Sequence, residues 1–123
     1  MAFKSNVTTD GDVTIVWLEG KITLGDGSGG LRETVRKVLE NGANKVLIDL
    51  GGVTYIDSAG LGELVGCYAT AQNRGASMKL LHLQKRVEGL MQITKLTTLF
   101  EVFEDEGQAL RSFHKTDTAS ATQ

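Results

Sequence analysis

Near the N-terminus, β-branched and aromatic positions are separated by polar residues that favour turns. Residues 13–19, VTIVWLE, are β-branched and aromatic, which predicts a strand. The preceding KSNVTT predicts a partner strand, joined to it through the turn signal Asp10-Gly11. KITL extends or follows the second strand, and the glycine-rich GDGSGG then breaks the pattern. The first quarter of the chain therefore predicts a hairpin.

Helix-like and strand-like segments alternate along the rest of the chain. Apolar residues at helical spacing, and acidic residues in the first turn of the last segment, predict helices at 31–42, 58–75, 85–96 and 105–114. Short apolar runs between them predict strands at 45–50, 78–83 and 99–103. This order predicts an α/β fold, with a mixed, mostly parallel sheet of about five strands and about four helices packed on it. Crossovers between parallel strands are expected to be right-handed.

Length, charge and cysteine content narrow the class of protein. A chain of 123 residues fits one domain, predicted at 1–114 with a polar C-terminal tail at 115–123. The net charge of −2 gives no reason to expect nucleic acid or an anionic membrane surface as partner. Lone Cys67 excludes an internal disulfide and fits a reducing compartment. The sequence contains no signal-peptide core and no apolar run near the ~20 residues of a membrane span, so a cytoplasmic protein is predicted.

A literal G-x-G-x-x-G at residues 25–30 is the sharpest alternative signal. It lies between a strand and a helix, and Asp49 follows where a ribose-binding acid would stand. Two features count against a dinucleotide site: the chain is short for a second mononucleotide-binding half, and the preceding strand is not a fully buried run. A nucleotide- or small-ligand-binding sensor stays open as an alternative.

Residues for metal binding or hydrolysis are poorly arranged. His82 is expected on a strand, pointing off the apolar face, and neither it nor His114 has a partner at metal-ligand spacing. A triad of Ser58, His82 and Asp57 lacks the G-x-S-x-G elbow, and the adjacent Asp57 and Ser58 would point in different directions. The prediction is a protein without a metal site, without catalytic residues and without enzymatic activity.

The stretch YIDSAGLG at residues 55–62 departs from good helix design. A buried strand ends there and a helix begins, yet Gly60 and Gly62 fall in its first turns, each at a cost of about 1 kcal/mol relative to alanine. Asp57 or Ser58 can cap the helix. A cap does not explain the glycines, including Gly66 further along.

Missing side chains let another backbone come close. The glycines and Leu61 therefore predict a shallow docking surface around the Ser58 hydroxyl. A phosphate there would add nearly two negative charges, which the helix N-terminus tolerates. A partner that closes over Ser58 beside Asp57 would have to desolvate that charge unpaired. The stretch therefore predicts a binding module controlled by phosphorylation.

These residues resemble a STAS domain, and more closely a bacterial anti-sigma factor antagonist. The core of the likeness is KVLIDLGGVTYIDSAGLGELV, and the resemblance covers about residues 3–113. It implies a partner-switching regulator of transcription whose unphosphorylated form binds an anti-sigma factor serine kinase and releases the sigma factor. The kinase then phosphorylates the serine, here Ser58, and a PPM-type phosphatase reverses this. ATP and magnesium would belong to the kinase, so no cofactor is expected.

The resemblance also assigns the partner surface and shows one departure. Gly20-Lys21-Ile22-Thr23 stands where many antagonists have G-E-[apolar]-D, so an acid is replaced by Lys21 and the aspartate by Thr23. This leaves a STAS scaffold subunit that is never modified as a further alternative. The residues expected to form the partner-binding surface are Asp57, Ser58, Ala59, Gly60, Leu61, Gly62, Thr23 and Gly20.

Overall fold

The structure, a computed structural model, describes residues 3–25 and 28–121, and the side chains of residues 3–25 and 29–114. The strands are β1 (Lys4–Asp10), β2 (Val13–Ile22), β3 (Lys45–Ile56), β4 (Ser77–Leu81) and β5 (Val102–Phe103). The helices are α1 (Ser28–Glu40), α2 (Ser58–Asn73), α3 (Lys85–Ile93) and α4 (Glu106–Ala121), with a short 3₁₀ helix, η1, at Leu96–Thr98.

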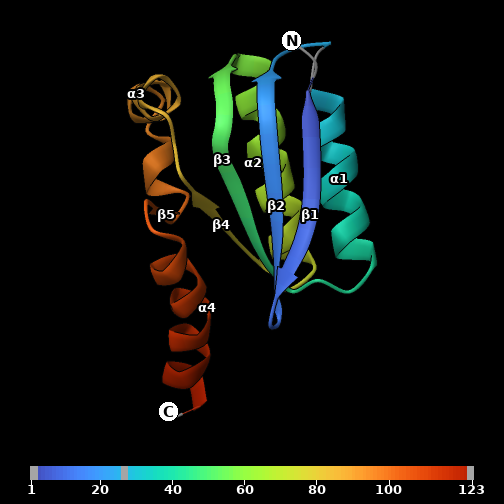
Figure 1. The fold of residues 1–123 in the computed structure, drawn as a ribbon, viewed down its shortest axis with the longest axis vertical. Helices are drawn as coiled ribbons and strands as arrows, with labels where there is room; N and C mark the ends of the chain where they lie inside the picture. The colour runs from blue at the N-terminus through green and yellow to red at the C-terminus, as the bar shows by residue number, and fades with distance from the viewer. Residues whose placement is uncertain (1–2, 26–27, 122–123) are drawn as a thin grey trace.

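The strands form one mixed sheet in the order β1-β2-β3-β4-β5 (Figure 1). β1 is antiparallel to β2, and the remaining neighbours are parallel. The hairpin turn centres on Gly11 and Asp12, one residue later than the sequence suggested, with Gly11 at φ 61°. The predicted α/β fold with a mostly parallel sheet and four α-helices is confirmed.

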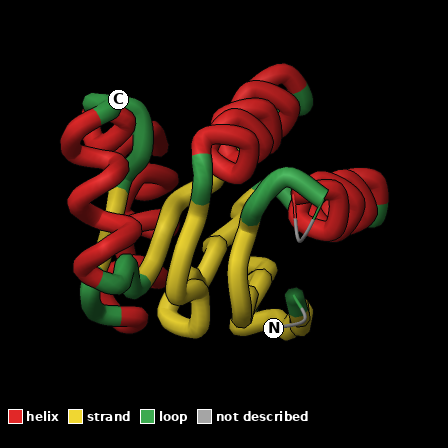
Figure 2. The backbone as a smooth tube through the Cα atoms, turned by 90° about the horizontal axis from the view of Figure 1, so that it is seen from above, coloured by secondary structure: helices red, strands yellow, loops and turns green. Residues whose placement is uncertain are grey.

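The helices form layers on both faces of the sheet. α1 and α2 lie side by side on one face (Figure 2), where apolar residues of α1, α2 and α3 share a buried cluster with the inward side chains of β2, β3 and β4. A smaller cluster on the opposite face is closed by Ala109 and Phe113 of α4. The strands β2, β3 and β4 contribute apolar side chains to both clusters, which explains the continuous apolar runs read from the sequence, whereas β1 is exposed along its whole length.

Strand β3 is longer than predicted. The apolar run predicted a strand over residues 45–50, and the two glycines that follow it, Gly51 and Gly52, are uncommon inside a strand. Instead β3 continues to Ile56, paired with the second half of β2 across register shifts. A Cβ on Gly52 would lie 2.8 Å from the carbonyl oxygen of Leu18, so the glycine permits close strand contact.

His82 lies just beyond β4 and not within a strand, so the predicted strand position is wrong. Its backbone is left-handed, with φ 60°, and its amide donates to the carbonyl of Phe103 at 2.9 Å. The ring Nδ1 lies 3.1 Å from a carboxylate oxygen of Asp49. His82 thus lies at the point where the chain leaves β4 for α3, and its ring contact with Asp49 joins this point to β3.

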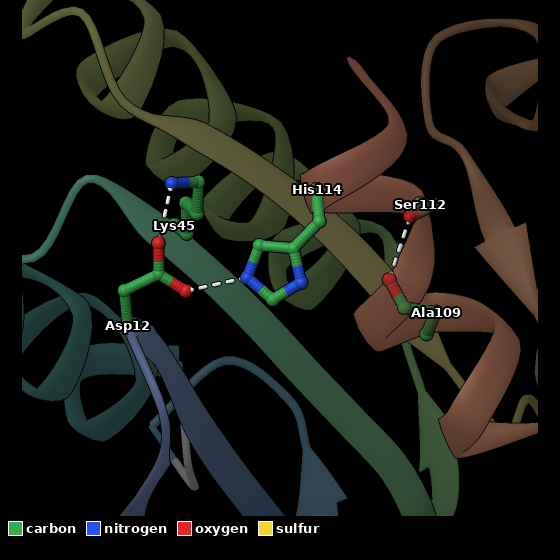
Figure 3. Close-up of polar contacts among 5 residues, drawn as sticks. All are labelled: Asp12, Lys45, Ala109, Ser112 and His114. Carbon is green, nitrogen blue, oxygen red and sulfur yellow. Dashed lines mark hydrogen bonds and ion pairs between the residues drawn. The ribbon is translucent and has the colours of Figure 1, made fainter. Parts of the chain in front are cut away.

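A side chain of helix α4, near the C-terminus, contacts the turn between β1 and β2, near the N-terminus. Asp12 accepts a hydrogen bond from Lys45 Nζ at 2.7 Å, and its other oxygen lies 2.7 Å from Nε2 of His114 (Figure 3). These two contacts lower the pKa of Asp12 to about 2. α4 runs to Ala121, across the predicted boundary between domain and tail at residues 114 and 115.

Candidate functional site

The candidate site lies where two parallel strands end together. Ile22 and Ile56, the last residues of β2 and β3, are paired in register. The loop after β2 begins with Thr23, and helix α2 begins at Ser58, one residue after Asp57. Because parallel strands place their carboxyl ends at one edge, this loop and the N-terminus of α2 meet there.

Asp57 caps α2 and holds the neighbouring loop at the same time. One carboxylate oxygen accepts from the amide of Gly60 at 2.8 Å, and the other accepts from the amide of Leu24 at 3.1 Å. These amide donors, with Gly60 contributing most, lower the pKa of Asp57 below its usual value. The residue is therefore ionised at neutral pH and bridges the helix to the loop.

The Ser58 hydroxyl is not used by the fold. The residue is exposed, and its oxygen makes no hydrogen bond with any part of the chain that the structure describes. The sequence left open whether Asp57 or Ser58 caps the helix, and the geometry assigns the side-chain cap to Asp57. Ser58 therefore presents a free hydroxyl beside a fixed negative charge.

Gly60 is buried, and its glycine has a reason inside the chain. A Cβ there would lie 2.1 Å from the carbonyl oxygen of Ile22 and 2.7 Å from Cγ1 of Ile56. The backbone that approaches Gly60 is thus this protein's own β2, and not that of a partner as the sequence suggested. The close contact lets the amide of Asp57 donate to the same Ile22 carbonyl at 3.2 Å.

Gly62 and Gly66 have no such internal reason. A Cβ at either position would meet nothing within 4 Å, and both residues are exposed. Beside Gly66, between α1 and α2, lies a cavity of about 230 Å³. An ion pair between Arg32 and Glu63 lies at this cavity. On the exposed face of α2, the two positions that follow Ser58 at a spacing of four residues, Gly62 and Gly66, therefore carry no side chain.

The other residues predicted for the partner surface are placed unevenly. Leu61 is 5% exposed and belongs to the core, and Gly20 is buried within β2 at φ 104°, so neither contributes surface. Ala59 and Thr23 are half-buried beside Ser58 and Asp57. The predicted surface therefore reduces to Asp57, Ser58, Ala59, Gly62 and Thr23, because the core requires the rest.

Leu24 is a candidate that the sequence analysis did not identify. Its side chain is 80% exposed, although its amide is fixed by Asp57. An apolar residue just before a glycine-rich break looks like the end of a strand. Only the bond to Asp57 shows that it stands next to Ser58.

The structure describes only part of the glycine-rich motif that was the alternative candidate for a nucleotide site. Residues 26 and 27 of the glycine-rich motif lie outside the described residues. Gly30 packs against Phe3, whose ring lies 2.8 Å from a Cβ built at that position. Asp49 is engaged by the Gly51 amide at 2.9 Å as well as by His82. Gly30 and Asp49 thus have structural roles of their own.

Neither a cluster of metal ligands nor a membrane-spanning helix is found among the described residues. Within them, no group of three or more His, Cys, Asp or Glu residues is placed to hold a metal ion. None of the described helices is both long and apolar enough to cross a bilayer.

Comparison with known proteins finds relatives described as anti-sigma-B factor antagonists. An anti-sigma-B factor antagonist of Bacillus subtilis is 38% identical over 72 residues, which is 58% of this chain and 65% of that protein. A Listeria monocytogenes protein with the same description is 38% identical over 61 residues, 50% of this chain and 54% of that protein. The chain thus aligns with less than two thirds of the length of these relatives.

Solved structures extend the likeness to the fold. An anti-sigma factor antagonist from Mycobacterium paratuberculosis superposes with a TM-score of 0.81 at 19% identity, covering 90% of this chain and 93% of the other. The phosphorylated form of the Bacillus cell-fate determinant SpoIIAA gives a TM-score of 0.67 at 16% identity, covering 91% and 99%. The sequence pattern of the STAS domain matches residues 4–109, nearly the whole chain. The protein belongs to the STAS domain family.

Proposed function

We propose that this protein is an anti-sigma factor antagonist whose binding is controlled by phosphorylation of Ser58. The unmodified form binds an anti-sigma serine kinase in the bacterial cytoplasm and so releases a sigma factor. Phosphorylation by that kinase dissociates the complex, and a PPM-type phosphatase restores it. The observation that carries the proposal is the exposed Ser58 hydroxyl, left free because Asp57 caps the helix.

Relatives support both parts of the proposal. The aligned proteins from Bacillus subtilis and Listeria monocytogenes are described as anti-sigma-B factor antagonists, and SpoIIAA is known in a phosphorylated form. These are regulatory binding proteins. We infer that the present chain likewise acts by binding, with ATP and magnesium supplied by its kinase.

Electrostatics explain how a phosphate can switch binding without unfolding the domain. The N-terminus of α2 carries a partial positive charge that favours an anion on Ser58. The same phosphate would stand next to the ionised Asp57 carboxylate. In solution both charges are hydrated. A partner surface that covers Ser58 would remove this water and leave the phosphate unpaired, which weakens the complex.

Binding of three variants to candidate anti-sigma kinases from the same organism tests the proposal. Ser58→Ala should bind the cognate kinase as tightly as wild type, whereas Ser58→Asp should bind at least about tenfold more weakly. Ser77→Asp is the matched control. It places the same charge at an exposed position at the start of β4. Because β4 is parallel to β3, and Ser58 follows the end of β3, Ser77 lies at the opposite edge of the sheet from Ser58.

The result that contradicts the proposal is equally clear. If Ser58→Asp binds the kinase as tightly as wild type while its circular dichroism is unchanged, charge at this position does not control binding. If Ser77→Asp weakens binding as much as Ser58→Asp, the effect comes from overall charge.

A further inference from the structure

The side chain of Leu24 is exposed to solvent, although its backbone amide is held by Asp57. The side chain is 80% exposed, whereas Ile22, two residues earlier, is fully buried. Single exposed leucines are common on protein surfaces. Most of them do not have an amide held by the carboxylate that flanks a candidate regulatory serine.

The bond from the Leu24 amide to Asp57 sets where this side chain projects. The donor–acceptor distance is 3.1 Å, and the other oxygen of the same carboxylate is engaged by Gly60 at 2.8 Å. One ionised group therefore fixes both the first turn of α2 and the loop that carries Leu24. Ser58 is the first residue of α2 and follows Asp57 directly, so its modification places a charge next to this shared carboxylate.

We propose that Leu24 is the apolar anchor of the partner surface, and that Asp57 couples its position to the phosphorylation of Ser58. The inference rests on the proposed function and names one residue by which the kinase recognises the unmodified protein. The partner feature that it requires is an apolar pocket beside the kinase's active site. A side chain buried in a well-packed pocket at the centre of an interface contributes far more to binding than contacts at the rim do.

Phosphorylation would loosen the anchor as well as add charge. The phosphate oxygens compete with the Asp57 carboxylate for amides at the start of α2, including that of Gly60, which donates to Asp57 in the unmodified protein. Repulsion between the two anions moves the carboxylate away, and the Leu24 amide loses its acceptor. The loop then no longer presents the side chain at one fixed position, so a pocket shaped for it gains less on binding.

A pair of alanine variants tests the anchor. Leu24→Ala should weaken binding of the unphosphorylated protein to the kinase by about 30-fold. Ile93→Ala is the matched control, because Ile93 is also 80% exposed but lies at the end of α3, and it should bind as wild type. Both variants remove exposed side chains, so both should fold with unchanged thermal midpoints.

The possible outcomes separate this inference from the proposed function. If Leu24→Ala and Ile93→Ala both bind as wild type while Ser58→Asp loses binding, Leu24 is not the anchor and the proposed function stands. If Ser58→Asp also binds as wild type, the proposed function itself fails.

Hydrogen exchange at the Leu24 amide tests the coupling by a readout that does not depend on binding. In the unmodified protein this amide should be protected, and phosphorylation of Ser58 should raise its exchange rate by at least about fivefold. The Asn41 amide, which donates to Lys37 at the end of α1, serves as the control and should be unaffected. An unchanged rate at Leu24 after phosphorylation would overturn the coupling.

Discussion

Substitution by alanine at Gly60 and at Gly62, in the first turns of α2, is expected to change the free energy of unfolding in opposite directions. At Gly60, a Cβ would lie 2.1 Å from the Ile22 carbonyl oxygen, so the helix or the strand end must move by about 1 Å to restore a normal contact. At Gly62, the same methyl group would meet nothing within 4 Å. The sequence shows the two positions as equivalent, and the structure separates them.

The expected changes in the free energy of unfolding combine the cost of overpacking with the gain in helix propensity. Overpacking against a backbone that cannot yield costs about 1–3 kcal/mol. The shift also stretches the bond from the Asp57 amide to Ile22, which contributes about 1 kcal/mol. Alanine recovers about 1 kcal/mol of helix propensity. Gly60→Ala should therefore lower the free energy of unfolding by about 2 kcal/mol, and Gly62→Ala should raise it by about 0.5–1 kcal/mol.

Urea denaturation followed by circular dichroism measures both changes. With a slope of about 2 kcal/mol per molar urea, the midpoint should fall by about 1 M in Gly60→Ala and rise by a few tenths of a molar unit in Gly62→Ala. A Gly60→Ala variant as stable as wild type would contradict the close contact with the Ile22 carbonyl. So would urea midpoints that move in the same direction in both variants. Gly62→Ala should also bind the kinase less well despite its higher stability, because the added methyl group lies on the exposed surface.

Three further predictions concern caps, charges and the thiol. Asp57→Ala removes both amide contacts and should lower the melting temperature by about 5 °C, whereas Ser58→Ala should leave it within about 1 °C of wild type. Asp12, with its pKa lowered to about 2, stabilises the native state above its ordinary pKa and loses this effect as pH falls through 2. The urea midpoints of wild type and Asp12→Asn should therefore differ at pH 6 and converge near pH 2. Burial raises the pKa of Cys67 to about 12, so iodoacetamide at pH 8 should modify the thiol only after unfolding; rapid alkylation of the native protein would contradict the buried position.

The order of strands and helices could be predicted because local patterns determine it. Continuous apolar runs marked β3 and β4, and helical spacing marked α1 and α3. The length of β3 could not be predicted, because its second half is held by β2 and contains two glycines that read as a break. Nor could the left-handed backbone of His82, which depends on Asp49 and on the Phe103 carbonyl.

From the sequence, Asp57 and Ser58 could be identified as candidate site residues, but their separate roles could not. Asp57 and Ser58 are adjacent in the sequence, so only their environment separates the capping residue from the free hydroxyl. Gly60 resembles Gly62 until the Ile22 carbonyl is placed against it. Leu24 is 33 positions away from Asp57, and no local signal reports that their backbone and side chain meet. Contacts of this kind arise from the way two parallel strands end at one edge.

Phosphorylation of Ser58 can be measured by intact and peptide mass after incubation with a kinase. The protein would be incubated with ATP, magnesium and each candidate anti-sigma kinase from the same organism. We expect a single phosphate on the peptide that contains Ser58, absent in Ser58→Ala and present in the Ser77→Asp control. A folded sample that no such kinase phosphorylates, or a phosphate that persists in Ser58→Ala, would contradict it.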